Sequence, residues 1–168
     1  EQVRNMGTIG GNIANGSPIG DTPPPLIALG ATLILRKGKQ RRTIPLEKYF
    51  IAYGKQDRQP GEFVEKVTVP VPARGEKFAI YKISKRRDED ITATLGAFFL
   101  RLAADGTVAE VRIAYGGMAA TPKRASAVEK ALIGKPWTEE TVVAAMAEYA
   151  SDFQPLTDMR ATADYRSM

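Results

Sequence analysis

The feature that most restricts the fold is a pair of alternating segments within residues 94–117. The stretch TLGAFFLRLAADGTVAEVRIAYGG has strand-forming residues on both sides of Asp105-Gly106, a dipeptide that favours a tight hairpin turn. The preceding stretch KFAIYKIS, residues 77–84, is also rich in β-branched and aromatic residues. Together these segments predict three antiparallel strands.

Two amphipathic segments follow the predicted strands. In the first, Thr121 is a candidate N-cap with Pro122 at the first helical position, and Gly134 ends the helix. Its apolar face consists of Ala125, Val128 and Leu132. The second helix is expected after Thr138, because Glu139 and Glu140 suit the positive end of the helix dipole. Its predicted core face consists of Val142, Met146, Tyr149 and Phe153.

The order of these segments predicts the fold class. Strands followed by segregated helices indicate an α+β fold, in which the helices cover one face of a small antiparallel sheet.

The N-terminal half is expected to contain a short helix, a hairpin and a further strand. Residues 25–31 favour the helix, and residues 31–37 and 40–46 form the hairpin around Lys37-Gly38-Lys39. In the returning strand Arg42 and Ile44 alternate with Arg41, Thr43 and Pro45. We therefore expect one face of this strand to be exposed to solvent. Pro45 makes that strand an edge or ends it.

Proline-rich sequence marks the best candidate for a domain boundary. Residues 61–72 predict another strand, which ends at Pro70 and Pro72. The segment 71–77 then lacks strand or helix character. We therefore expect one domain over residues 1–73 and a second over residues 74–168.

Composition excludes several kinds of chemistry. The chain contains no cysteine and no histidine. Disulfides, thiolate metal sites and a cysteine nucleophile are therefore impossible within the chain, and the commonest metal ligand and general base are missing. Serine-histidine catalysis cannot occur within this chain alone.

The net charge of +5 comes largely from residues 35–42 and 82–90. Neither basic stretch contains interleaved aromatic residues, so we expect no nucleic-acid partner.

No run of about 18 apolar residues and no leader-like segment is found, which predicts a soluble, cytoplasmic protein without a membrane partner. The chain begins at Glu1 and ends in DYRSM, and we expect it to be a piece of a longer chain.

Glycine is concentrated in residues 7–21, GTIGGNIANGSPIGD, which hold five glycines. Such a stretch permits positive φ and lets a ligand approach the main chain, so that N–H groups can face an anion. It matches neither of the two common glycine-rich phosphate motifs. From the residues alone, an anion-binding loop and an ordinary tight turn both remain open.

The order of residues around this stretch resembles a known family. The segment 6–31 is similar to the second flavin-binding stretch of the xanthine dehydrogenase family, in which a Gly-Gly-Asn-Ile turn precedes Ser-Pro-Ile-x-Asp. Three further segments agree with the FAD-binding domain of the small subunit of that family, in the same order along the chain: YKISKRRDEDIT (81–92), AYGGMAATPKRA (114–125) and PLTDMRATADYR (155–166).

The resemblance implies a fold and a set of cofactors. The first domain would be the later part of a flavin-binding subdomain, and the second would resemble the C-terminal domain of the CO dehydrogenase flavoprotein. In the family, FAD collects electrons from a molybdopterin centre through 2Fe-2S clusters and passes them to NAD. The implied partners are a molybdopterin-binding large subunit and the iron-sulfur part of the same small subunit. The pyrophosphate loop and cluster cysteines of the family are absent here and would lie N-terminal to Glu1.

The resemblance also implies cofactor-binding residues. Gly7, Thr8, Gly11 and Asn12 would lie in the turn against FAD. Asp21 would accept a hydrogen bond from a flavin hydroxyl or from the backbone of the site, with a simple cap before the prolines as the alternative.

Three more residues match family positions near the cofactor. Lys82 matches a flavin-contacting lysine, and Val64 matches an apolar position whose backbone touches the cofactor. Both could instead be scaffold, with Lys82 solvated. Glu89 stands where the family often has Asp, within the charged segment 85–90. Negative charge near the flavin ring opposes its reduction and positive charge favours it, so this segment could set the flavin potential; the alternative is a self-neutralising surface loop.

Three functions remain open at this point. The first is the FAD portion of a purine-oxidising xanthine dehydrogenase, inactive as this piece alone. The second is the medium FAD subunit of a carbon monoxide or aldehyde dehydrogenase of the same superfamily. The third is a non-catalytic assembly module that has lost the cofactor.

Overall fold

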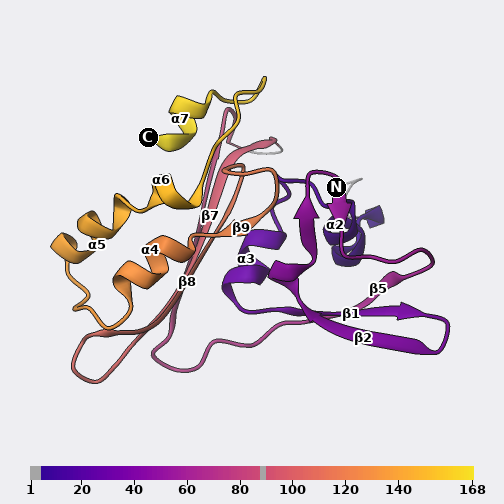
Figure 1. Ribbon diagram of the computed structural model, residues 1–168, viewed down its shortest axis with the longest axis horizontal. Helices are drawn as coiled ribbons and strands as arrows, with labels where there is room; N and C mark the ends of the chain where they lie inside the picture. Colours follow the sequence, from indigo (N-terminus) through magenta and orange to yellow (C-terminus); the bar gives the residue numbers. More distant parts are fainter. Residues whose placement is uncertain (1–4, 88–89) are drawn as a thin grey trace.

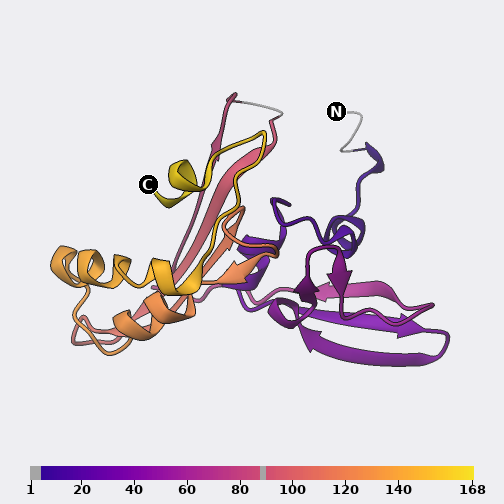
Figure 2. The ribbon, with the colours of Figure 1, turned by 45° about the horizontal axis from the view of Figure 1, so that its top comes forward.

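The computed structural model describes residues 5–87 and 90–168, and they form a three-stranded and a four-stranded antiparallel sheet with a helix between them, and a small two-stranded sheet of β3 and β4 (Figures 1 and 2). The N-terminal half contains α2 (Ile9–Asn15), α3 (Pro23–Ala28), β1 (Thr32–Lys37), β2 (Gln40–Pro45), η1 (Leu46–Lys48), β3 (Phe50–Ala52), β4 (Lys55–Gln56) and β5 (Phe63–Thr68). The C-terminal half contains β6 (Lys77–Ser84), β7 (Thr92–Leu102), β8 (Val108–Gly116), β9 (Lys123–Arg124), α4 (Ser126–Leu132), α5 (Glu139–Met146), α6 (Tyr149–Asp152) and α7 (Ala163–Ser167).

The N-terminal sheet has the strand order β2-β1-β5. The hairpin of β1 and β2 turns at Gly38, whose φ of 58° lies in the left-handed region. Leu33 and Leu35 on β1 are fully buried, whereas β2 is half-exposed and forms the sheet edge that carries Pro45. The predicted hairpin and its edge proline are therefore confirmed.

The C-terminal sheet has the order β6-β7-β8-β9. Its central hairpin turns at Gly106, where φ is 82°, as the sequence predicts. The expected three strands are joined by a fourth, because Lys123 and Arg124 pair with Tyr115 and Ala114 of β8.

Both faces of β7 are covered. Ala97 belongs to a core with Ile27 of α3 and Leu33 of β1. On the other face Phe98 packs in a second core with Val128 of α4. The helices α4–α6 thus cover one face of the sheet, as predicted, and α3 from the N-terminal half covers the other (Figure 2).

The start of α4 differs from the expectation. The helix begins at Ser126, not after Thr121, because the preceding residues pair with β8 and the Ala125 N–H donates to the Ile113 carbonyl at 2.8 Å. The Asp152 carboxylate of α6 then accepts from the Ala127 N–H at 2.9 Å and caps the helix from a distant part of the chain.

The second predicted helix is confirmed at its start and broken further on. Thr138 is the N-cap of α5, and its hydroxyl accepts from the Thr141 N–H at 3.3 Å. The helix stops at Met146, and α6 resumes at Tyr149. Phe153 is buried as expected, but the assignment of Met146 to the core is wrong, since its side chain is 53% exposed.

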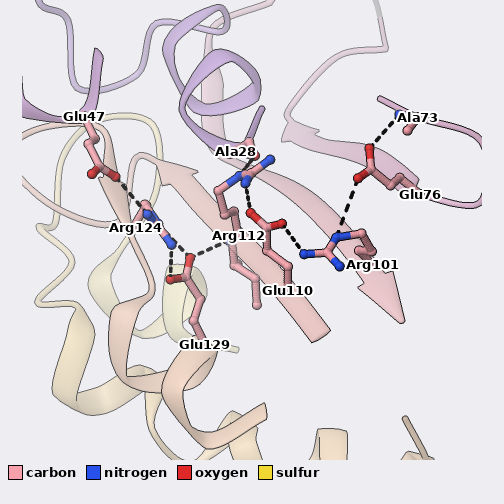
Figure 3. Close-up of polar contacts among 10 residues, drawn as sticks. Ala28, Glu47, Ala73, Glu76, Arg101, Glu110, Arg112, Arg124 and Glu129 are labelled. Atoms are coloured by element: carbon pink, nitrogen blue, oxygen red, sulfur yellow. Dashed lines mark hydrogen bonds and ion pairs between the residues drawn. The ribbon is translucent and has the colours of Figure 1, made fainter. Parts of the chain in front are cut away.

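Polar contacts join the two halves of the chain (Figure 3). Arg112 of β8 donates to the Ala28 carbonyl of α3 at 2.6 Å and stacks 4.0 Å from the Phe99 ring centroid. Arg124 of β9 pairs with Glu47 of η1 at 3.1 Å. These contacts fix α3 and η1 on the C-terminal sheet.

None of the helices in the described part of the chain has the length and apolar character to span a bilayer.

Candidate cofactor site

The glycine-rich stretch forms a short helix instead of the expected turn. Thr8 is the N-cap of α2, and its hydroxyl accepts from the Gly11 N–H at 2.9 Å. Gly16, with φ of 64°, ends the helix and donates its N–H to the Ile13 carbonyl. Ile13 is fully buried and anchors the helix in the core.

The two glycines of α2 differ in how closely they are packed. A Cβ on Gly10 would lie 3.6 Å from the Val64 carbonyl oxygen, so α2 packs closely on β5 at this point. A Cβ on Gly11 would lie 2.8 Å from the Thr8 hydroxyl oxygen and would disturb the cap. Val64 in β5 is half-buried, and it packs against α2 at Gly10.

The predicted residues of α2 lie on its outer side. Gly7, Thr8, Gly11 and Asn12 are all exposed. The Asn12 side-chain oxygen accepts from the Thr22 hydroxyl at 2.5 Å, which connects α2 to the segment before α3.

Asp21 and Lys82 form an ion pair that joins the two halves of the chain. One carboxylate oxygen of Asp21 accepts from Lys82 Nζ at 2.7 Å, and the other accepts from the Thr92 hydroxyl. Lys82 is 33% exposed and also donates to the Asp90 carbonyl at 2.8 Å, so it is not a freely solvated lysine. Asp21 is bonded across the chain rather than to the helix that starts at Pro23, so a simple cap does not describe it.

The charged segment after β6 is held by its own backbone contacts. The Ser84 hydroxyl donates to the Arg86 carbonyl at 2.7 Å, and the Arg86 N–H donates to the Asp90 carboxylate at 2.7 Å. The second bond holds the pKa of Asp90 below its ordinary value. Glu89 lies outside the described residues, so its expected approach to the flavin ring stays a prediction.

The structure brings the remaining predicted residues into two neighbouring groups. The outer side of α2 is bonded through Asn12 to Thr22, and the adjacent Asp21 is bonded to Lys82. Sequence reasoning did not single out Thr22 or Thr92. Thr92, only 1% exposed, is the last residue of the segment 81–92. The sequence carries no signal that distinguishes it from other strand residues, and its buried hydroxyl becomes apparent only in the structure.

The chemistry of these residues suits FAD. The outer side of α2 offers the hydroxyl hydrogen of Thr8, the side-chain amide of Asn12 and glycine backbone without side chains, which phosphate and ribityl oxygens can approach closely. Lys82 and Asp21 add one charge of each sign beside this surface. The donors and the small side chains fit a large, hydroxylated, phosphate-bearing cofactor.

Two family models match the chain in succession. The FAD-binding domain in molybdopterin dehydrogenase matches residues 1–72, and the CO dehydrogenase flavoprotein C-terminal domain matches residues 79–168. These matches define the class, a flavoprotein of the molybdenum hydroxylase type. The chain belongs to the family of CO dehydrogenase flavoproteins and xanthine dehydrogenases, and represents their FAD-binding domain.

The relatives come from several enzymes. Nicotinate hydroxylase hnxS of Emericella nidulans is 40% identical over 146 residues, 84% of this chain and 11% of that protein. The carbon monoxide dehydrogenase medium chain of Hydrogenophaga pseudoflava is 36% identical over 99% of this chain and 57% of its own length. Xanthine dehydrogenase of Oryza sativa subsp. japonica is 37% identical over 81% of this chain and 10% of its own length.

Solved structures agree with the fold. Carbon monoxide dehydrogenase from Hydrogenophaga pseudoflava superposes with a TM-score of 0.91 at 38% identity, covering 99% of this chain and 57% of that chain. The present chain therefore spans little more than half of the medium-chain relative and about a tenth of the two longer enzymes.

Proposed function

We propose that this chain forms part of the flavin module of a molybdenum hydroxylase and carries electrons from iron-sulfur clusters through FAD to an acceptor. The observation that supports this most directly is the Asp21–Lys82 ion pair beside the exposed side of α2, in a chain matched almost throughout by FAD-binding and flavoprotein models.

Each predicted residue has a separate task in this proposal. Thr8 and Asn12 bind the phosphate and ribityl part of FAD through the hydroxyl hydrogen of Thr8 and the side-chain amide N–H groups of Asn12. Gly7 and Gly11 have no side chains and let the cofactor approach the main chain closely. Asp21 and Lys82 position the segment before α3 and the loop after β6 around the cofactor. Bound FAD supplies the ability to accept and return electrons one or two at a time.

Val64 and Glu89 complete the proposed set. Val64 holds α2 at its distance from β5. Glu89 contributes negative charge near the flavin ring, which makes flavin reduction less favourable.

Two parent enzymes are compatible with this role. A xanthine dehydrogenase that oxidises purines and reduces NAD is one, in keeping with matches to xanthine dehydrogenases from several organisms. A carbon monoxide or aldehyde dehydrogenase is the other, favoured by medium chains that align with 98% and 99% of this chain. In both, the partner is a molybdopterin-binding large subunit and the enzyme is cytoplasmic. Residues 1–73 and 74–168 are its two domains, which share the core around Ile27, Leu33 and Ala97.

Anaerobic flavin bleaching distinguishes these parents. The full-length protein, purified with its partner subunits, should carry FAD, and its absorbance near 450 nm should fall on addition of xanthine, of carbon monoxide or of an aldehyde. The substrate that bleaches it identifies the parent, and NAD reduction identifies the acceptor. A preparation that binds no added FAD would contradict the proposal and favour the assembly module.

A further inference from the structure

The segment 155–166, PLTDMRATADYR, has no task in the proposed flavin function. It runs into the short helix α7, which Figure 1 shows beside one end of the C-terminal sheet. Arg166 of this helix is almost completely buried, with a side chain that is 2% exposed. A buried guanidinium group needs acceptors close by, so the partners of Arg166 show what this segment holds together.

The Arg166 guanidinium joins three separate parts of the chain. Its Nη1 donates to the carbonyl of Ala93 in β7 and, at 2.9 Å, to the carbonyl of Gly117, directly after β8. Its Nη2 donates to the Asp158 carboxylate at 2.8 Å. A Cβ on Gly117 would lie 2.8 Å from Arg166 Nη1, so a glycine at this position leaves room for the guanidinium.

The Asp158 carboxylate supplies the charge that opposes Arg166. Although desolvation opposes ionisation, the N–H groups of Arg160 and Ala161 and the Arg166 guanidinium lower the pKa of Asp158 to about 2. Asp158 is therefore ionised at neutral pH. A buried cation with an ionised partner and two carbonyl acceptors is well compensated, so the arrangement holds the guanidinium in one place.

Both main-chain acceptors of Arg166 are next to groups that hold the segment before α3. The Gly117 N–H donates to the Pro18 carbonyl at 2.8 Å. Thr92, directly before the other acceptor, donates its hydroxyl to the Asp21 carboxylate. Pro18, Gly117 and Arg166 also line one cavity of about 350 Å³, so they lie close together. The segment is thus held at two points by main chain that Arg166 fixes.

We infer that Arg166 is a positioning residue of the flavin site: through the Ala93 and Gly117 carbonyls it fixes the main chain that holds residues 18–21 beside FAD. This inference rests on the proposed function, because it assigns Arg166 to the site that contains Asp21. Arg166 acts through these contacts and is not itself a ligand of the cofactor. Loss of the guanidinium should loosen residues 18–21 and thereby weaken FAD binding.

Hydrogen–deuterium exchange of the flavin-free full-length protein tests the link within the chain. In Arg166→Gln, peptides that contain residues 17–21 should exchange at least about fivefold faster than in the wild type, because local opening becomes easier. Arg124→Gln is the matched control, since Arg124 also joins distant elements, through Glu47 at 3.1 Å and Glu129 at 2.6 Å. Exchange at residues 17–21 should be unchanged in this control.

Fluorescence titration with FAD tests the consequence for the site in the full-length protein with its partner subunits. Arg166→Gln should raise the dissociation constant of FAD at least about tenfold, because the loosened segment must be ordered again when the cofactor binds. Arg124→Gln should stay within about twofold of the wild type. Arg166→Lys keeps a charged donor near the two carbonyls, so its affinity should lie between those of the wild type and Arg166→Gln.

The failures of the inference and of the proposed function differ in this experiment. Wild-type protein that binds no FAD would contradict the proposed function, and the inference with it. Wild-type protein that binds FAD, with unchanged exchange or unchanged FAD affinity in Arg166→Gln, would overturn the role of Arg166 alone. Equal losses of affinity in Arg166→Gln and Arg124→Gln would also overturn it, since any loss of a buried link would then suffice. If Arg166→Gln does not fold, Arg166→Lys takes its place, and exchange and affinity equal to those of the wild type overturn the role.

Discussion

The three-stranded N-terminal sheet and the four-stranded C-terminal sheet are stabilised in different ways. Strand β7 at the centre of the C-terminal sheet is buried on both faces, between α3 and the helices α4–α6. Strand β1 of the N-terminal sheet buries Leu33 and Leu35 on one face only. Near its other face Glu65 bonds to Arg36 and Arg41 at 2.7 and 2.6 Å, which is an exposed ion-pair cluster.

This difference separates the stable part of the chain from its candidate site. Burial of apolar surface on both faces gives the C-terminal sheet the larger contribution to stability, whereas exposed ion pairs contribute little. Most of the proposed cofactor residues lie on exposed parts of the N-terminal half. Changes in the C-terminal sheet should therefore affect folding, and changes in the candidate site should affect FAD binding.

The largest loss of folding stability is expected at Gly117, directly after strand β8 of the C-terminal sheet. Gly117 has a φ of 85°, and a Cβ there would lie 2.3 Å from the Ala93 carbonyl oxygen. Gly117→Ala should lower the free energy of unfolding by about 4 kcal/mol or more, because strained backbone and a clash with main chain occur together. Gly106→Ala is the control, with a similar φ of 82° and no atom within 4 Å, and should cost about 1 kcal/mol. Equal losses in urea denaturation would show that the close packing at Gly117 is unimportant.

A somewhat smaller loss of folding stability is expected from a substitution in the core beneath the N-terminal sheet. Leu35 is fully buried, and Leu35→Ala should cost about 3 kcal/mol through lost burial and the remaining cavity. Ile51→Ala, at a side chain that is 54% exposed, should cost less than about 1 kcal/mol. If both variants unfold at the same urea concentration, the N-terminal sheet does not depend on its single apolar face.

The parts of the fold that the sequence predicted depend on local signals. The hairpin at Asp105-Gly106 and the cap at Thr138 could be predicted from the sequence, because turn and cap residues act on their immediate neighbours. The start of α4 could not be predicted, since the carboxylate that caps it belongs to Asp152, 25 residues away from Ala127 along the chain. The helix α2 was also missed, because glycines disfavour helices, and the tight approach of Gly11 to the Thr8 hydroxyl becomes apparent only in the folded chain.

The candidate site could be predicted only through the family resemblance. Asp21 and Lys82 are 61 residues apart in the chain, and no local pattern connects them. Thr92, which bonds to the same carboxylate, would read simply as a strand residue. A site assembled from distant segments leaves no spacing signal in a single sequence.

Acid should affect the N-terminal sheet through Glu62, whose side chain is 7% exposed. Bonds from the Arg42 guanidinium and the Gln59 N–H lower the pKa of Glu62 from 4.5 to about 2. Because the folded pKa is the lower one, this stabilisation is fully present above about pH 4.5 and is lost as the pH falls towards about 2.

Thermal unfolding as a function of pH tests this contribution. The melting temperature should fall between about pH 4.5 and about pH 2, and Glu62→Gln should reduce the size of that fall. Glu148→Gln, at an exposed position of the C-terminal half, should leave the pH profile unchanged. A wild-type profile retained in the Glu62 variant would exclude this ion pair as the cause.

The smallest effect on stability, with the largest effect on function, is expected at Asp21. Its side chain is 48% exposed, so Asp21→Asn should change the free energy of unfolding by less than about 1 kcal/mol. FAD content of the full-length protein should nevertheless fall, since the neutral amide loses the charge that holds Lys82 at 2.7 Å beside the candidate site. Asp57→Asn is a matched control, because Asp57 is 43% exposed and also pairs with a basic side chain, Arg42, yet is not one of the predicted FAD residues. Absorbance of bound flavin after gel filtration, measured beside urea denaturation, compares the two. Normal flavin content in Asp21→Asn together with a clear loss of stability would make the Asp21–Lys82 pair a structural link between the two halves of the chain and would remove it from the cofactor site.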